Sequence, residues 1–103
     1  PGLAERREDI EPNIEYELER FARLNNSLVT FTSDAREQFL KFSHTKEAIW
    51  NANFRDLNAA ITRMATLAVG GRITMPDVEE EILRLQQHWE GITPQNERAE
   101  RLL

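Results

Sequence analysis

The sequence predicts an all-α protein, a small bundle of four to five helices. Apolar residues recur three and four positions apart through most of the chain, the spacing that places them on one face of a helix. Capping residues begin these runs, and glycine or asparagine ends them. A chain of 103 residues, 40% of them hydrophobic, has room for one domain with a modest core. Helices that are apolar on one side only must pack on one another, which gives a bundle.

Capping and breaking residues divide the chain into its predicted helices. Acidic residues and Pro12 suit the first turn of the first helix, which Asn25–Asn26–Ser27 end. Thr32 or Ser33 caps the second helix, and Thr45 caps a short helical turn. The β-leaning stretch between the first two helices is too short for more than an extended connector or a tiny strand. The helices are expected over residues 8–25, 33–44, 46–50, 54–69 and 75–90, and the connector over residues 28–31.

The clearest helical pattern follows the turn Asn51–Ala52, with Asn53 as the expected cap. Gly70–Gly71 close this helix. Thr74 caps the last helix, which has Pro76 in its first turn. The apolar stripes are Phe54, Leu57, Ile61, Met64 and Ala68 in the former helix and Val78, Ile82, Leu85 and Trp89 in the latter.

The charge balance argues against a nucleic-acid surface. Thirteen basic residues against 18 acidic residues give a net charge of -5, and acids cluster at Glu15–Glu17–Glu19 and Glu79–Glu80–Glu81, which we expect to be solvated helix faces. Phosphate backbones are bound by concentrated Lys and Arg, whereas here basic residues stand singly among acids. No apolar run approaches the roughly 20 residues that cross a bilayer, so no membrane contact is expected. The lack of cysteine fits a reducing compartment, and we expect a cytoplasmic protein.

No grouping of side chains indicates an autonomous active site. His44 and His88 lie in different predicted helices without further ligands at metal-binding spacing, so no metal site is expected. Trp50 and Trp89 could stack on a ligand, but aromatic residues at helical spacing are more often core. Gly70–Gly71 lack the following Lys-Ser/Thr of a phosphate-binding loop. We therefore expect no catalytic residue and no ATP hydrolysis by this chain alone.

Arg55 stands at a position that is unusual for an arginine. It lies in the first turn of the clearest helix, directly before Asp56. Helix N-termini favour anions and disfavour a cationic side chain. Arg55 is therefore expected either to pair with Asp56 or Asp77, the commoner case for a surface arginine, or to meet a phosphate beside the helix dipole.

Two segments resemble motifs of the sigma-54-dependent activators, a family of AAA+ ATPases. Residues 50–57, Trp-Asn-Ala-Asn-Phe-Arg-Asp-Leu, are similar to the Trp-Pro-Gly-Asn-Val-Arg-Glu-Leu motif, which carries the sensor II arginine of that family. Residues 1–10, Pro-Gly-Leu-Ala-Glu-Arg-Arg-Glu-Asp-Ile, look like the Pro-Leu-Arg-Glu-Arg-Arg-Glu-Asp-Ile segment that joins the ATPase core to its C-terminal lid. The resemblance covers residues 1 to about 90 and departs from the family pattern where Asn51–Ala52 replaces Pro-Gly. Two motifs in the right order are more specific than either alone.

The resemblance implies that this chain is the helical lid of a longer ATPase. Residues 1–7 would be the linker from the core, residues 8–91 the lid, and residues 92–103 a linker or the start of a following segment. The partners of the lid would be the AAA+ core of the same chain and those of neighbouring subunits. Through that core, a ring of subunits would use ATP hydrolysis to remodel the closed complex of sigma-54 RNA polymerase.

The resemblance also implies a nucleotide-binding role for three residues. The guanidinium of Arg55 would reach the terminal phosphate of ATP, which binds with magnesium in the core. Ile10 and Phe54 would offer apolar contacts to adenine and ribose, although simple core positions explain both residues equally well. The lid would then move with the nucleotide state.

Two other functions stay open at this level. A stand-alone helical interaction module would dock a partner helix on an exposed apolar seam, with Arg55 in a salt bridge. A helix-turn-helix protein would read DNA bases with the helix over residues 54–69. The linker-like N-terminus counts against the module, and the low positive charge counts against the DNA binder.

Overall fold

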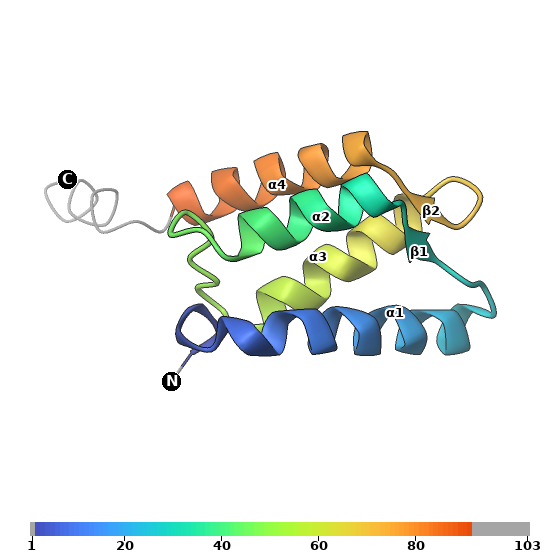
Figure 1. The fold of residues 1–103 in the computed structure, drawn as a ribbon, viewed down its shortest axis with the longest axis horizontal. Coiled ribbons are helices and arrows are strands. Elements are labelled where there is room, and N and C mark those ends of the chain that lie inside the picture. Colours follow the sequence, from blue (N-terminus) through green and yellow to red (C-terminus); the bar gives the residue numbers. More distant parts are fainter. Residues whose placement is uncertain (1, 92–103) are drawn as a thin grey trace, which may run out of the picture.

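The computed structural model describes residues 2–91, which form four α-helices and one small sheet (Figure 1). The elements are the 3₁₀ turns η1 (Leu3–Glu5) and η2 (Arg7–Asp9), then α1 (Ile10–Asn25), β1 (Thr30–Phe31), α2 (Ser33–Ser43), α3 (Phe54–Leu67), β2 (Arg72–Ile73) and α4 (Met75–Glu90). α3 packs on both α1 and α4, while α2 packs mainly on α4. The predicted all-α bundle is thereby confirmed. None of the described helices has the length and apolarity of a membrane span.

The core forms around α3. Leu57, Ile61 and Met64 of this helix are at most 2% exposed, as their helical spacing predicts. Burying an apolar side chain of this size contributes roughly 1.5–3 kcal/mol, so this stripe is a main source of stability. The buried apolar residues of the two neighbouring helices are Ile10, Ile14 and Leu18 in α1 and Val78, Leu85 and Trp89 in α4.

The caps predicted for α2 and α4 are confirmed. The hydroxyl of Thr32 accepts the Ala35 N–H at 3.4 Å. Thr74 and Asp77 form a capping box, in which the Asp77 carboxylate accepts the Thr74 N–H at 2.9 Å. Each cap satisfies N–H groups that have no partner within the helix, which stabilises a helix by about 1 kcal/mol.

The connection between α2 and α3 differs from the prediction, because residues 46–50 do not form a helical turn. Ala48 and Trp50 are buried while Ile49 between them is exposed, an alternation that a helix does not give. Trp50 has a left-handed backbone with φ of 44°, which no helix contains, and its side chain is 1% exposed. The prediction that Trp50 and Trp89 are core residues is confirmed: their rings meet edge to face with centroids 5.1 Å apart. Burial of the Trp50 ring therefore overrides the local helical preference.

The N-terminal segment packs on the bundle. α1 begins at Ile10 and not at the predicted residue 8, because residues 7–9 form η2. Leu3 in η1 is 1% exposed and belongs to the hydrophobic core. The segment expected as a linker, residues 1–7, thus contributes a buried side chain to the bundle. Residues 92–103, expected to be a linker or the start of a following segment, lie outside the described residues.

Two short parallel strands lie at the end of the bundle opposite the N-terminal segment, which we call the β end (Figure 1). β1 pairs with β2 in the register Thr30 with Arg72 and Phe31 with Ile73. Of the two forms expected for residues 28–31, an extended connector or a tiny strand, the structure has a two-residue strand. Its partner is a new finding, because a strand of this length is too short to show a readable alternation of apolar and polar residues.

Gly70 and Gly71 form the turn that enters β2. Their φ angles are 64° and 74°, which an L-residue adopts only at a cost. α3 has already ended at its C-cap Ala68, so the prediction that the two glycines close the helix is corrected. They serve the turn between Val69 and Arg72, which form an antiparallel bridge.

A buried carboxylate ties α3 to α4. Glu81 is 1% exposed and accepts hydrogen bonds from Arg63 at 2.6 Å and from Arg84 at 2.6 Å. The hydrogen bond to Glu81 raises the pKa of Arg63, and the negative charge of Glu81 acts in the same direction. Glu17 in α1 is likewise 5% exposed. The two acidic clusters are therefore not wholly solvated faces, since each has one member turned inward.

The two glycines provide matched tests of the turn. Positive φ costs an alanine roughly 1–2 kcal/mol at either position. A Cβ on Gly71 would also lie 2.5 Å from the carbonyl oxygen of Leu28, whereas a Cβ on Gly70 would meet nothing within 4 Å. We expect Gly71→Ala to lower the free energy of unfolding by about 2–4 kcal/mol and Gly70→Ala by about 1–2 kcal/mol. Chemical denaturation of both variants measures this, and equal losses would contradict the close contact with Leu28.

Candidate functional site

Arg55 projects from the first turn of α3. It directly follows Phe54, the first residue of the helix, and its side chain is exposed. Within residues 2–91 the Arg55 guanidinium takes part in no hydrogen bond and no ion pair. The structure thus presents a free cation at the positive end of the α3 dipole, where the N–H groups of Arg55 and Asp56 already donate to the carbonyl oxygens of Ala52 and Asn53.

Both carboxylates that the sequence offers to Arg55 bind elsewhere. Asp56 is 8% exposed, and its Oδ2 accepts the Ala52 N–H at 2.8 Å and the Trp89 indole N–H at 2.9 Å. Asp77 caps α4 through Thr74. The salt bridge considered from the sequence is therefore absent from the described part of the chain.

Arg55 and Arg72 differ from every other arginine among residues 2–91. The others each hold a carboxylate or a backbone carbonyl. Arg72 lies in β2, at the opposite end of the bundle from the start of α3 (Figure 1). Arg55 alone of these two combines an open guanidinium with a helix N-terminus, an arrangement that attracts a phosphate or another anion.

The other two predicted nucleotide contacts differ in exposure. Phe54 is 41% exposed and directly precedes Arg55 in the chain, so it offers apolar surface in the same first turn of α3. Ile10 is 0% exposed and packs in the core. Arg55 and Phe54 are therefore both exposed in the first turn of α3, while Ile10 presents no surface to a ligand in this conformation.

The loop before α3 contains contacts that the sequence did not indicate. Asn53 precedes the helix as expected, but its side chain makes no capping bond. Its Oδ1 accepts the Leu3 N–H from the N-terminal segment at 3.0 Å. The Asp56 carboxylate, and not the Asn53 amide, binds the backbone of this loop, where it accepts the Ala52 N–H. The sequence did carry one signal for Asp56, because an acid three residues after a capping residue has the spacing of a capping box.

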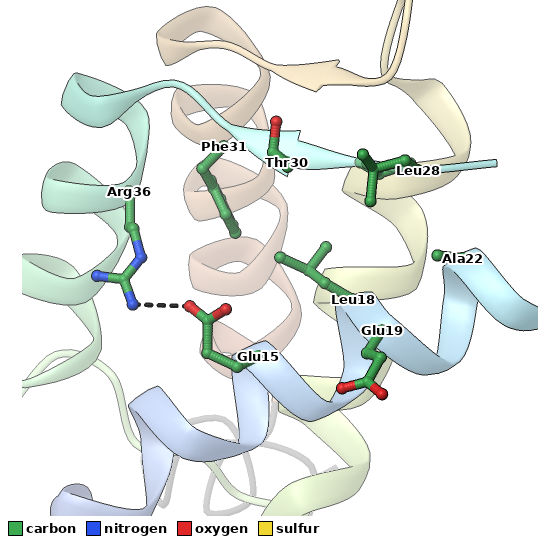
Figure 2. A pocket seen from close by; sticks show the side chains of 9 residues that line it. Glu15, Leu18, Glu19, Ala22, Leu28, Thr30, Phe31 and Arg36 are labelled. Carbon is green, nitrogen blue, oxygen red and sulfur yellow. Dashed lines mark hydrogen bonds and ion pairs between the residues drawn. The ribbon is translucent and has the colours of Figure 1, made fainter.

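A groove between α1 and β1 is distant from this site, toward the β end of the bundle (Figure 2). It has a volume of about 360 Å³ and is lined by Leu18, Leu28 and Phe31 among others. Its arginine, Arg36, pairs with Glu15 at 2.7 Å, as the dashed line in Figure 2 marks. The groove therefore has no cation free for a phosphate.

The described residues hold no cluster that fits a metal ion. No group of three or more His, Cys, Asp or Glu side chains comes together within residues 2–91. His44 binds the carbonyl oxygen of Leu40 through its ring nitrogen at 2.7 Å, which ties it to its own helix.

Comparisons with known proteins agree with the fold. A family model described as the AAA+ ATPase lid domain matches residues 4–94. Over 94 residues the chain is 50% identical to the transcriptional regulatory protein RtcR of Escherichia coli (strain K12), an alignment that covers 91% of this chain and 18% of that protein. The chain therefore spans less than a fifth of the length of this relative. No solved structure gives a significant match.

Truncation of Asp56 should destabilise the fold, whereas truncation of its neighbour Arg55 should leave the stability almost unchanged. Asp56→Ala leaves the Trp89 indole N–H and the Ala52 N–H without an acceptor, so the free energy of unfolding should fall by about 2–4 kcal/mol. Arg55→Ala removes an exposed side chain with no partner and should change it by less than about 0.5 kcal/mol. Denaturant titration of the two variants checks this, and a large loss in Arg55→Ala would reveal a structural role for the arginine.

Proposed function

Because the chain belongs to the family of AAA+ ATPase lid domains, we propose that it is the lid of an ATPase that regulates transcription and that Arg55 senses the terminal phosphate of ATP. One observation carries the proposal: the Arg55 guanidinium is open at the N-terminus of α3, while Asp56, the next residue, binds Ala52 and Trp89, and Asp77 lies at the other end of the bundle, where it caps α4. The nucleotide and its magnesium would be bound by an AAA+ core, since this chain has no phosphate-binding loop.

The chemistry at the start of α3 matches a phosphate. A guanidinium can donate two parallel hydrogen bonds to phosphate oxygens, and the helix dipole adds partial positive charge at the same place. When the terminal phosphate leaves, this charge-assisted contact is lost, so the energetically preferred position of the lid changes with the nucleotide state. Phe54 would cover an apolar part of the nucleotide beside this contact. A contact of Ile10 with adenine would require its side chain to become uncovered.

The wider role rests on likeness to other proteins. The 50% identical relative is named a transcriptional regulatory protein, and residues 50–57 resemble the sensor II motif of sigma-54-dependent activators. In such a protein, a ring of subunits would couple ATP hydrolysis to remodelling of sigma-54 RNA polymerase in the cytoplasm. The lid would supply the sensor, and the cores of its own and neighbouring subunits would be its direct partners.

An interaction module is the second candidate, and one observation favours it. Large apolar side chains are exposed at the β end of the bundle: Leu24, Leu28, Leu67 and Val69 are 58–87% exposed. Exposed apolar side chains that gather at one end suit a protein contact. An interaction module would not need Arg55 for its function, so a test of Arg55 separates this candidate from the sensor proposal.

We expect Arg55→Ala to lower the ATP turnover of the intact ATPase by about tenfold or more, because it removes a contact made with the terminal phosphate. Arg55→Lys should recover only part of the rate, since an ammonium cannot donate two parallel hydrogen bonds. Steady-state hydrolysis at saturating ATP measures both. Arg72→Ala is the matched control, because Arg72 is another exposed arginine without a side-chain partner among residues 2–91. Wild-type turnover in Arg55→Ala would remove the sensor assignment and favour the interaction module.

The 103-residue chain by itself should show no ATP turnover above a buffer blank. Phosphoryl transfer needs a phosphate cradle and magnesium ligands, which the sequence does not supply. Phosphate release measured with the purified chain tests this. Turnover that persists through repurification and increases with protein concentration would contradict the proposal.

A further inference from the structure

Asn53 connects the N-terminal segment to the turn that carries Arg55. Its amide oxygen accepts the Leu3 N–H at 3.0 Å across the molecule. Its own backbone has φ of 55° and ψ of -130°, which residues other than glycine rarely adopt. Such a conformation persists only where the surroundings hold it in place. The Arg55 N–H in turn donates to the Ala52 carbonyl oxygen at 3.1 Å, so the loop and the first turn of α3 form one unit.

The N-terminal segment fits closely against Asn53. A Cβ built on Gly2 would lie 2.5 Å from the Asn53 Oδ1 atom, so a larger residue at this position would displace the amide from its present place. The backbone of Gly2, with φ of -85° and ψ of 177°, is one that any residue adopts. A side chain at position 2 would therefore disturb the Asn53 amide, while the backbone conformation itself would tolerate it.

Other contacts hold the same segment to the loop. Arg7 donates to the carbonyl oxygens of Ser43 and Ala48 in the connection between α2 and α3. Leu3 is buried in the core. The N-terminal segment is thus fixed at both of its ends, while the Asn53 amide is the contact nearest to Arg55.

We propose that Asn53 is a positioning residue, which sets the direction of the Arg55 turn according to the position of the N-terminal segment. The Asn53 amide accepts a hydrogen bond from the N-terminal segment, and its backbone leads directly into α3. A displacement of residues 2–9 would therefore move Asn53 and, with it, the helical turn that contains Arg55. The proposal rests on the sensor function of Arg55. It adds that the segment and the sensor move together.

Asn53→Gly separates the amide contact from the backbone conformation. Glycine accepts φ of 55° without strain, so the fold should be retained while the acceptor for the Leu3 N–H is lost. Asn53→Asp keeps an acceptor oxygen at the same place and should restore the contact. Asn58→Ala is the matched control, because it removes another amide near the start of α3 whose partner is Asn13 in α1.

Hydrogen exchange followed by NMR on the 103-residue chain measures the structural part. In Asn53→Gly the amides of Leu3 and Arg55 should both exchange about tenfold faster, while Asn53→Asp and Asn58→Ala keep the wild-type rates. Faster exchange at Leu3 alone would show a bond that does not position Arg55, and would overturn the proposal. Unchanged exchange at both amides would overturn it as well.

ATP turnover of the intact ATPase measures the functional part. Asn53→Gly should lower kcat by about tenfold, and combining it with Arg55→Ala should lower kcat no further than Arg55→Ala does alone. Gly2→Ala should lower kcat in the wild-type background and have no added effect beside Asn53→Gly, because the missing amide leaves room for the methyl group.

The possible failures can be told apart. Wild-type kcat in Asn53→Gly together with slow turnover in Arg55→Ala would overturn the positioning role and leave the sensor function standing. Additive losses from Gly2→Ala and Asn53→Gly would also overturn the positioning role. Wild-type kcat in Arg55→Ala would overturn the sensor function and the positioning proposal that rests on it.

Discussion

The hydrogen bonds of the Asp56 carboxylate are the constraint on which the candidate site depends. This buried group joins the Ala52 N–H of the loop to the Trp89 indole N–H of the last turn of α4. A buried carboxylate without donors would be strongly destabilising, so the loop, α3 and α4 share one arrangement. Successive residues of a helix point about 100° apart, and the inward position of Asp56 therefore directs Arg55 to the surface.

A second buried carboxylate fixes α3 to α4 farther along the same pair of helices. The Glu81 carboxylate accepts hydrogen bonds from Arg63 of α3 and from Arg84 of its own helix. With Asp56 and Glu81 at different levels, α3 cannot shift along α4 without breaking charge-assisted contacts. This rigidity suits a lid, because a displacement at one end reaches the other end without being absorbed by sliding helices.

The turn before α3 accommodates the replacement of Pro-Gly by Asn51–Ala52. The left-handed backbone conformations fall on Trp50 and Asn53, on either side of this pair. Ala52 is not among the residues with positive φ, so it is tolerated where the family motif has glycine. The interactions of the flanking residues hold the turn: the Trp50 ring is buried, and the Asn53 amide binds the N-terminal segment.

The sequence by itself determined the four main helices, the caps at Thr32 and Thr74, and the position of Arg55 at the start of α3, because helical period and capping are local properties. It misjudged residues 46–50, whose conformation follows from the burial of Trp50. Only the tertiary structure decided that Asp56 binds Trp89 and that Asn53 binds Leu3, since these partners are 33 and 50 residues apart. Nothing in local spacing relates such distant positions, so the partners of these polar groups, and with them the freedom of Arg55, depend on how the helices pack.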